Sequence, residues 1–292
     1  MDSRSLRLFL LCVAIWGTTW LAIRYQLGSV APEVSVGYRF LLAAGLATLI
    51  VRLRGQSVVP PRSAHGILAL FGLSTFTAGY ICVYYAETLI TSGLVAVGYS
   101  LTPLLNHFAA RLALGAPPNR SIELGGTLGA VGVSLVFGPE LARVSFSRDL
   151  VLGGALTLAA VLCSTVGTVL AKRLEERAIG VWQKVAWSMA YGGAGCLVVA
   201  LVLGRELSFS LAPGYLISLG YLAAFGSVAA FAAYLTLFES IGVGRAGYVG
   251  VLVPVVALLV STVFEDFQPT AWTALGLAFV LAGQAAVARR GS

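Results

Sequence analysis

The chain has 292 residues, of which 58% are hydrophobic and only 11% are charged, and its mean hydropathy is +0.91. Soluble domains carry about 25% charged residues, so these charges are too few to cover a surface that faces water. The composition excludes a soluble enzyme, a nucleic-acid-binding module and a disordered chain. In a membrane protein the positions of Lys and Arg in the loops indicate the orientation of the chain, and the net charge of +7 is less informative.

A membrane-spanning helix needs about 20 mostly apolar residues. Charges and turn residues separate ten such segments, and we expect an all-α integral membrane protein with ten transmembrane helices. The first segment is longer than the apolar core of a signal peptide and lacks a small-residue cleavage site, so we expect it to be a helix of the mature protein. In chain order the segments are residues 8–23, 34–51, 64–85, 90–110, 122–138, 150–171, 180–203, 215–238, 246–264 and 270–288.

The positive charges alternate between the two sides of these segments. With the N-terminus inside, thirteen Lys and Arg residues fall in inside segments and four fall in outside segments, while Arg39 and Lys184 lie within spans. Because Lys and Arg accumulate in cytoplasmic loops, this split predicts that both termini are cytoplasmic. A multi-pass membrane protein follows, with membrane lipid as a partner and no nucleic acid; the chain is expected to be a monomer or a dimer.

The sequence contains an internal repeat with a shift of 151 residues. The spacing of Pro103, Gly125 and Gly132 recurs as Pro254, Gly276 and Gly283. Ten spans then divide into two five-helix copies, residues 1–138 and 139–292. Because five is odd, the second copy crosses the membrane in the opposite direction. Such inverted repeats place a binding site near the membrane midplane and permit alternating access.

Aromatic and polar side chains recur inside the predicted spans. Buried polar groups are costly in lipid, so they indicate a wet central cavity. A helix–helix hydrogen bond is the alternative for His107, and interfacial belts are the alternative for rings near span ends. We expect Pro103 and Pro254 to allow helix bending and gating. The predicted cavity residues are Trp16, Thr19, Tyr38, Tyr80, Tyr84, Tyr99, Asn106, His107, Ser164, Trp187, Tyr191, Tyr234 and Tyr248, with Trp16, Tyr99 and Tyr248 nearest the substrate.

Two charged residues inside spans leave alternatives open. For Arg39 and Lys184 we favour snorkelling to the membrane interface, since both lie close to a span end. The other interpretation is that one of them binds a substrate carboxylate. No Asp or Glu lies near a span centre, where proton-coupled carriers place their proton-binding group. We therefore expect a facilitator (a uniporter), with a proton-coupled drug/metabolite efflux carrier as the alternative.

An intramembrane enzyme is less consistent with the spacing of reactive groups. Ser100 and His107 share a helix face, but seven residues separate them by about 10 Å along the axis, too far for a nucleophile–base pair. The four cysteines lie in apolar segments without C-x-x-C spacing, so no metal site is expected. We predict no catalytic residues and no cofactor.

Three short motifs in order resemble the EamA-type carriers of the drug/metabolite transporter superfamily: WGTT at 16–19, RFLLAA at 39–44 and LTPL at 101–104. Within that family the chain is most similar to YddG-like exporters of aromatic and other neutral amino acids. The resemblance implies an inner-membrane exporter whose cavity is formed by spans one, three, four, six, eight and nine, with spans five and ten packed outside. The chain departs from the family at Gly115-Ala116, where an acidic Gly-Glu is common, and it has Glu265-Asp266 in the second copy. Cationic drugs are not expected as main substrates, because the first-span glutamate of small multidrug relatives is absent.

Overall fold

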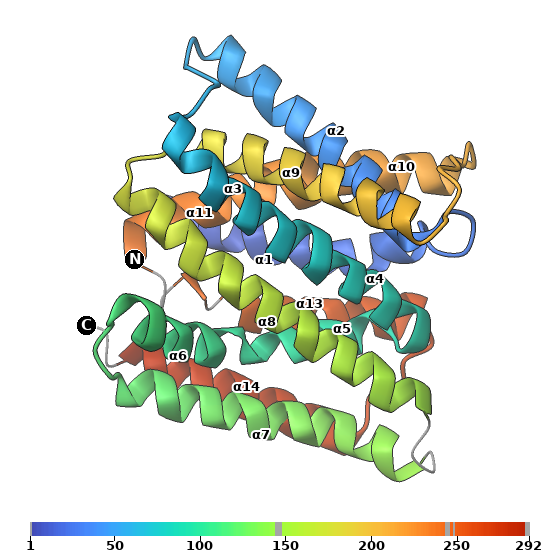
Figure 1. The fold of residues 1–292 in the computed structure, drawn as a ribbon. Coiled ribbons are helices and arrows are strands. Elements are labelled where there is room, and N and C mark those ends of the chain that lie inside the picture. Colours follow the sequence, from blue (N-terminus) through green and yellow to red (C-terminus); the bar gives the residue numbers. More distant parts are fainter. Residues whose placement is uncertain (1, 144–147, 243–245, 248, 290–292) are drawn as a thin grey trace.

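The computed structural model describes residues 2–143, 148–242, 246–247 and 249–289. Every regular element within these ranges is a helix, and they contain no β-strand, so the expected all-α class is confirmed. The helices lie side by side along one direction, with α7 and α14 along one edge of the bundle and α2 along the opposite edge (Figure 1).

The predicted first copy begins with two uninterrupted helices and continues with segments that change helix type. Its elements are α1 (Ser3–Arg24), α2 (Pro32–Leu53), the 3₁₀ turn η1 (Arg62–Ala64), α3 (His65–Phe71), the π-helical segment η2 (Gly72–Gly79), α4 (Tyr80–Leu89), α5 (Ser92–Gly98), the 3₁₀ turn η3 (Tyr99–Leu101), α6 (Thr102–Leu114) and α7 (Arg120–Arg143).

The second half repeats this order with fewer interruptions. Its elements are α8 (Arg148–Glu176), α9 (Val181–Val202), α10 (Pro213–Tyr221), the π-helical segment η4 (Leu222–Ala229), α11 (Ala230–Ile241), α13 (Val249–Phe264) and α14 (Ala271–Arg289).

Local chemistry places several helix ends. The carboxylate of Asp2 accepts a hydrogen bond of 2.6 Å from the Ser5 backbone N–H and caps α1. Pro32 stands in the first turn of α2, where the missing N–H of proline has no cost. Gly115 ends α6 at a φ of +66°, a left-handed conformation that side chains with a Cβ rarely adopt.

Helices cover each of the ten predicted segments, but their lengths differ. Within the described ranges, six helical stretches are long and apolar enough to cross a membrane, and two further apolar helices are shorter. The fourth predicted span is interrupted at η3, directly before Pro103 in the first turn of α6. In contrast, Pro254 lies within the continuous helix α13. The structure thus supports a membrane protein, and ten crossings remain a prediction.

Helices α7 and α14 pack closely and run antiparallel. A Cβ added to Gly132 would lie 2.5 Å from the Gly276 carbonyl oxygen, and one added to Gly283 would lie 2.5 Å from the Gly125 oxygen. A shift of 151 residues converts the first contact into the second. This exchange is the geometry of two equivalent helices related by a local two-fold axis. Only glycine permits so close an approach of two backbones.

Helices α2 and α9 are antiparallel as well. Val34, near the start of α2, shares a hydrophobic cluster with Ala200, near the end of α9. At the other end, the Arg54 guanidinium lies 4.6 Å from the centre of the Trp182 ring. We name the two ends of the bundle after α1: the Asp2 end lies at its first turn and the Arg24 end at its last turn.

Candidate functional site

A cavity of about 130 Å³ lies inside the helix bundle. Its walls come from α1, α3, η2, α4, η3, α6, α8, α11 and α13, with one residue from α2; α7 and α14 contribute none of the described lining residues. The lining consists of Trp16, Thr19, Trp20, Ile23, Arg39, Phe71, Thr75, Tyr80, Val83, Tyr99, Thr102, Ser164, Gly167, Thr168, Ala171, Phe231, Tyr234, Leu235, Phe238, Gly247, Gly250 and Val253.

Six of the predicted cavity residues line this cavity: Trp16, Thr19, Tyr80, Tyr99, Ser164 and Tyr234. The Trp16 indole N–H donates to the Gly226 carbonyl oxygen at 3.1 Å, which fixes the orientation of its ring. That ring lies 5.2 Å from Tyr234 and 5.1 Å from Phe231, centre to centre. Across the cavity wall, the hydroxyls of Tyr99 and Ser164 are 3.5 Å apart. Rings and hydroxyls from different helices therefore meet at one site.

Six other predicted residues lie away from the cavity. The Tyr38 hydroxyl donates to the Leu207 carbonyl oxygen at 3.1 Å, and the Tyr84 hydroxyl donates to Gln26 at 2.6 Å. Trp187 donates to the Val58 carbonyl oxygen at 2.8 Å. Their positions inside the predicted spans indicate depth along a helix, but such a position does not show which neighbour the side chain faces. The residues outside the lining are Tyr38, Tyr84, Asn106, His107, Trp187 and Tyr191, and Tyr248 lies outside the described residues.

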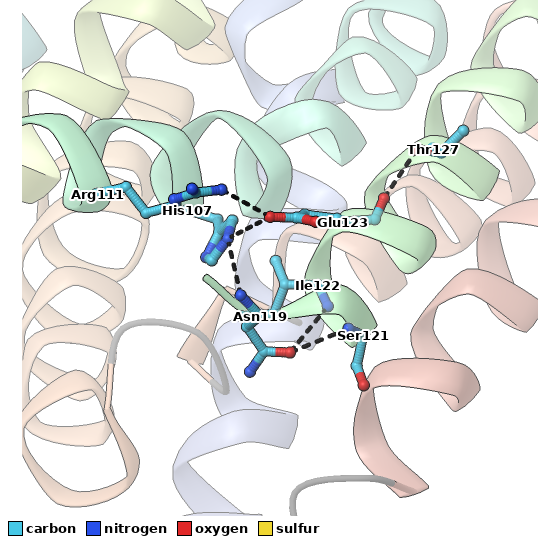
Figure 2. Close-up of polar contacts among 7 residues, drawn as sticks. All are labelled: His107, Arg111, Asn119, Ser121, Ile122, Glu123 and Thr127. Atoms are coloured by element: carbon cyan, nitrogen blue, oxygen red, sulfur yellow. Dashed lines mark hydrogen bonds and ion pairs between the residues drawn. The ribbon is translucent and has the colours of Figure 1, made fainter. Parts of the chain in front are cut away.

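His107 belongs to a contact between α6 and the start of α7 (Figure 2). Its Nε2 lies 3.4 Å from the Glu123 carboxylate, which also accepts a hydrogen bond of 2.8 Å from Arg111. Asn119 caps α7 by accepting hydrogen bonds from the Ser121 and Ile122 backbone N–H groups, at 3.0 and 3.3 Å. The helix-contact interpretation of His107 therefore fits this geometry better than a cavity role.

Sequence reasoning missed several residues that line the cavity. Trp20 follows Trp16 by one helical turn, and its ring lies 5.2 Å from the Tyr99 ring. Phe71 and Phe231 also line the site. We selected side chains with polar groups, so phenylalanines in apolar segments gave no signal; only the i, i+4 spacing of Trp20 from Trp16 could have revealed one of these residues.

Arg39 and Lys184 are both buried inside the protein, so the snorkelling interpretation is wrong. Their exposed fractions are 1% and 0%. The Lys184 ammonium forms an ion pair of 2.6 Å with Glu239. Arg39 lines the cavity, and its Nε donates to the Ser227 hydroxyl at 3.0 Å. Protein neighbours, rather than lipid headgroups, surround both charges.

A polar cluster closes the bundle at the Arg24 end. Arg24 Nε lies 3.3 Å from the Glu265 carboxylate, which also accepts hydrogen bonds from Ser92 and Ser261. Glu87, in the last turns of α4, is 1% exposed, and neither of its carboxylate oxygens has a hydrogen-bond partner among the described residues. The cavity lining that the structure describes includes no Asp or Glu.

Ser100 and His107 do not pair with each other. The Ser100 hydroxyl donates to the Val97 carbonyl oxygen at 2.7 Å, whereas His107 contacts Glu123. Over the described ranges, the structure holds no group of three His, Cys, Asp or Glu side chains placed to bind a metal ion. The chemistry of the site is therefore that of a cavity lined by rings and hydroxyls.

The sequence model of the EamA-like transporter family matches residues 4–138 and 151–289. The chain belongs to this family. Its members are transporters and not enzymes, so this family places the chain among membrane transporters.

Curated relatives of this EamA-like chain are also named as transporters for the most part. The chain is 29% identical over 273 residues to an "Uncharacterized inner membrane transporter YedA" of Escherichia coli K12, covering 90% of this chain and 84% of YedA. It is 24% identical to an "Uncharacterized transporter" of Archaeoglobus fulgidus, covering 96% and 97% of the two chains. A match to protein PagO of Salmonella typhimurium, 31% identical, covers 37% of this chain and 35% of PagO.

A solved crystal structure shares the fold of this chain. Its TM-score is 0.75 over 99% of both chains, at 20% sequence identity. At this identity the likeness concerns the fold alone.

Proposed function

We propose that this EamA-family protein exports small metabolites, namely aromatic and other neutral amino acids, across the bacterial inner membrane by alternating access. The observation that carries the proposal is the cavity, whose described lining is rich in Trp, Tyr and Phe rings and holds a single charged residue, Arg39. Aromatic walls favour solutes with apolar side chains, and the scattered hydroxyls can bind their polar groups. By alternating access these solutes would cross the membrane without being chemically changed.

The proposed topology is ten spans in two inverted five-helix copies, residues 1–138 and 139–292, with both termini cytoplasmic. The two family matches, at residues 4–138 and 151–289, support this division. The antiparallel contact of α7 with α14 supports the inversion, because equivalent helices in an inverted repeat cross the membrane in opposite directions. In this proposal the protein is a monomer or a dimer surrounded by membrane lipid, and nucleic acid is not a partner.

The two ends of the bundle indicate how access would alternate. Toward the Asp2 end, the cavity reaches Phe238 and Gly247, near the end of α11 and before α13. At the Arg24 end, the cluster of Arg24 and Glu265 lies beyond the cavity residues Ile23 and Val83. We infer that this cluster is the outer closure of the cavity, and that rocking of the two copies must break it for release.

Transport by purified protein in liposomes tests the proposal. We expect labelled phenylalanine, methionine and threonine to equilibrate across the membrane at the same rate with and without a pH gradient, because no described lining residue is a carboxylate. Empty liposomes give the passive rate. If none of the three amino acids moves faster than in empty liposomes, the proposed substrate class is wrong.

One observation favours the alternative of a proton-coupled drug/metabolite efflux carrier. Within the part of the chain that the structure describes, the buried Glu87 carboxylate has no hydrogen-bond partner, and it lies within electrostatic range of Arg24, Arg39 and Glu265. Buried carboxylates in membranes can carry protons. Strict dependence of transport on the pH gradient, abolished by Glu87→Gln, would establish this alternative. An intramembrane enzyme would instead convert its substrate during incubation with purified protein.

A further inference from the structure

We propose that Arg39 is the substrate-binding residue that recognises the carboxylate of the transported solute. This inference rests on the proposed function, because it takes the central cavity as the solute site. It adds the chemical class of the solute: an organic anion or zwitterion with one carboxylate and an apolar or aromatic remainder.

Arg39 has an unused hydrogen-bond donor at the cavity. Its Nε donates to the Ser227 hydroxyl at 3.0 Å, whereas Nη1 is buried and has no hydrogen-bond partner among the described residues. The guanidinium carbon lies 4.7 Å from the centre of the Tyr80 ring and 5.1 Å from that of Phe40. These contacts hold the guanidinium group in place, but a ring face cannot accept all the hydrogen bonds that its N–H groups can donate.

The internal repeat provides a comparison for this free cation. Lys184 occupies the corresponding helix of the second copy, and its charge is neutralised by Glu239 at 2.6 Å. Glu87 near the end of α4 matches Glu239 of α11 with a shift of 152 residues, and its carboxylate makes no hydrogen bond within the described residues. Glu87 lies within electrostatic range of Arg39, but no ion pair that the structure describes includes Arg39. The first copy therefore holds a buried cation without a directly bonded anion, whereas the cation of the second copy has one.

A carboxylate is the ligand that best completes this arrangement. A buried donor without an acceptor is costly, and a guanidinium group forms its strongest hydrogen bonds with carboxylates and phosphates. The described lining holds no second cation to neutralise the additional charge of a phosphate. The rings of Trp16, Trp20 and Tyr99 lie in the same cavity and can accommodate an aromatic side chain. Phenylalanine combines both features, and phenylalaninamide has the same ring without the carboxylate.

The test compares these two compounds by ligand-induced thermal stabilisation and by competition with labelled phenylalanine in liposomes. We expect wild-type protein to bind phenylalanine at least tenfold more tightly than phenylalaninamide. Arg39→Met should lose that preference by reducing phenylalanine binding alone, while Arg39→Lys should keep part of it. Removing an unpaired buried cation should not prevent folding, and the melting temperature without ligand checks this.

Lys184→Met is the matched control. It removes the buried cation of the corresponding helix, which lies outside the described cavity lining, so it should lower thermal stability through the unpaired Glu239 but preserve the preference for the carboxylate. Equal binding of phenylalanine and phenylalaninamide by wild-type protein, unchanged in Arg39→Met, would overturn the inference and leave the transport proposal intact. Wild-type binding of benzoate but not phenylalanine, lost in Arg39→Met, would support Arg39 and refute amino acids as substrates. Binding of neither compound would refute both proposals.

Discussion

The Trp16 ring of the cavity is held by a contact with another helix. The Trp16 N–H donates to the Gly226 carbonyl oxygen in η4 at 3.1 Å, which anchors the polar edge of its indole. Thr18, nearly two turns before the end of α1, forms a hydrogen bond of 2.7 Å with the Tyr221 hydroxyl of α10 instead. Neighbouring positions of one helix thus serve a cavity and a helix contact respectively.

Trp16→Ala should weaken substrate binding, because the substitution removes one aromatic wall. Burial of a large apolar side chain contributes about 1.5–3 kcal/mol, which corresponds to a rise in KM of about tenfold or more. Trp187→Ala is the control, since Trp187 lies outside the cavity lining and donates to Val58. Initial transport rates measured against substrate concentration give the KM of each variant. A similar rise in KM for the two variants would contradict the assignment of this wall.

Changes of helix type occur at equivalent places in the two halves of the chain. The π-helical segments η2 and η4 have eight residues each and begin 150 residues apart, at Gly72 and Leu222. Such segments are uncommon and leave backbone carbonyl groups less regularly paired. In contrast, α7 and α14 are uninterrupted, and glycines hold them together. The two kinds of helix suit moving and fixed parts of a transporter.

Gly132→Ala should destabilise the protein, because the added Cβ would meet the Gly276 backbone at 2.5 Å and force α7 away from α14. Overpacking of this kind costs about 1–3 kcal/mol. Gly45→Ala is the matched control: the glycine is helical, exposed and has no atom within 4 Å of the added Cβ. Because alanine has a higher helix propensity than glycine, the Gly45→Ala variant should be as stable as the wild type or more stable. Thermal unfolding in detergent measures both, and equal melting temperatures would exclude a tight helix contact.

The whole molecule has two ends that differ in their closing contacts. The Arg24 end is closed by an ion pair and two serine hydroxyls around Glu265. At the Asp2 end, Lys184 of α9 forms an ion pair of 2.6 Å with Glu239 of α11, and the loop after α2 is joined to α9 by hydrogen bonds such as that from Gln183 to the Ser57 carbonyl oxygen at 2.9 Å. The start of α1 and the end of α14 share the Asp2 end (Figure 1). Orientation in the membrane then decides which end releases the solute.

Single cysteines at the two ends should report this orientation. In a variant without native cysteines, Leu211→Cys at the Arg24 end should react with a membrane-impermeant maleimide in intact cells. Leu112→Cys in α6, at the Asp2 end, should react only after the membrane is permeabilised. Both leucines are exposed, at 77% and 89%, so access to the side chain does not limit either reaction. The reverse labelling pattern would place both termini outside and invalidate the count of loop charges.

Helix positions were predictable, and cavity residues were predictable only in part. Runs of apolar residues between charges located the helical segments, because lipid requires each crossing to satisfy its own backbone. The interruption at η3 follows from Pro103, whereas η2 and η4 have no such sequence signal. Trp16 and Trp187 look equivalent in sequence, yet only Trp16 lines the cavity.

Hydropathy and glycine spacing are read along the linear chain, so they were sufficient to identify a helical membrane protein whose two halves share a pattern. Which side chains contact one another became known from the packed helix bundle. Helix α2 turns Arg39 toward the cavity, while α9 turns Lys184 toward Glu239. The direction of a side chain across a helix bundle depends on the packing of neighbouring helices, and residues far apart in sequence set that packing.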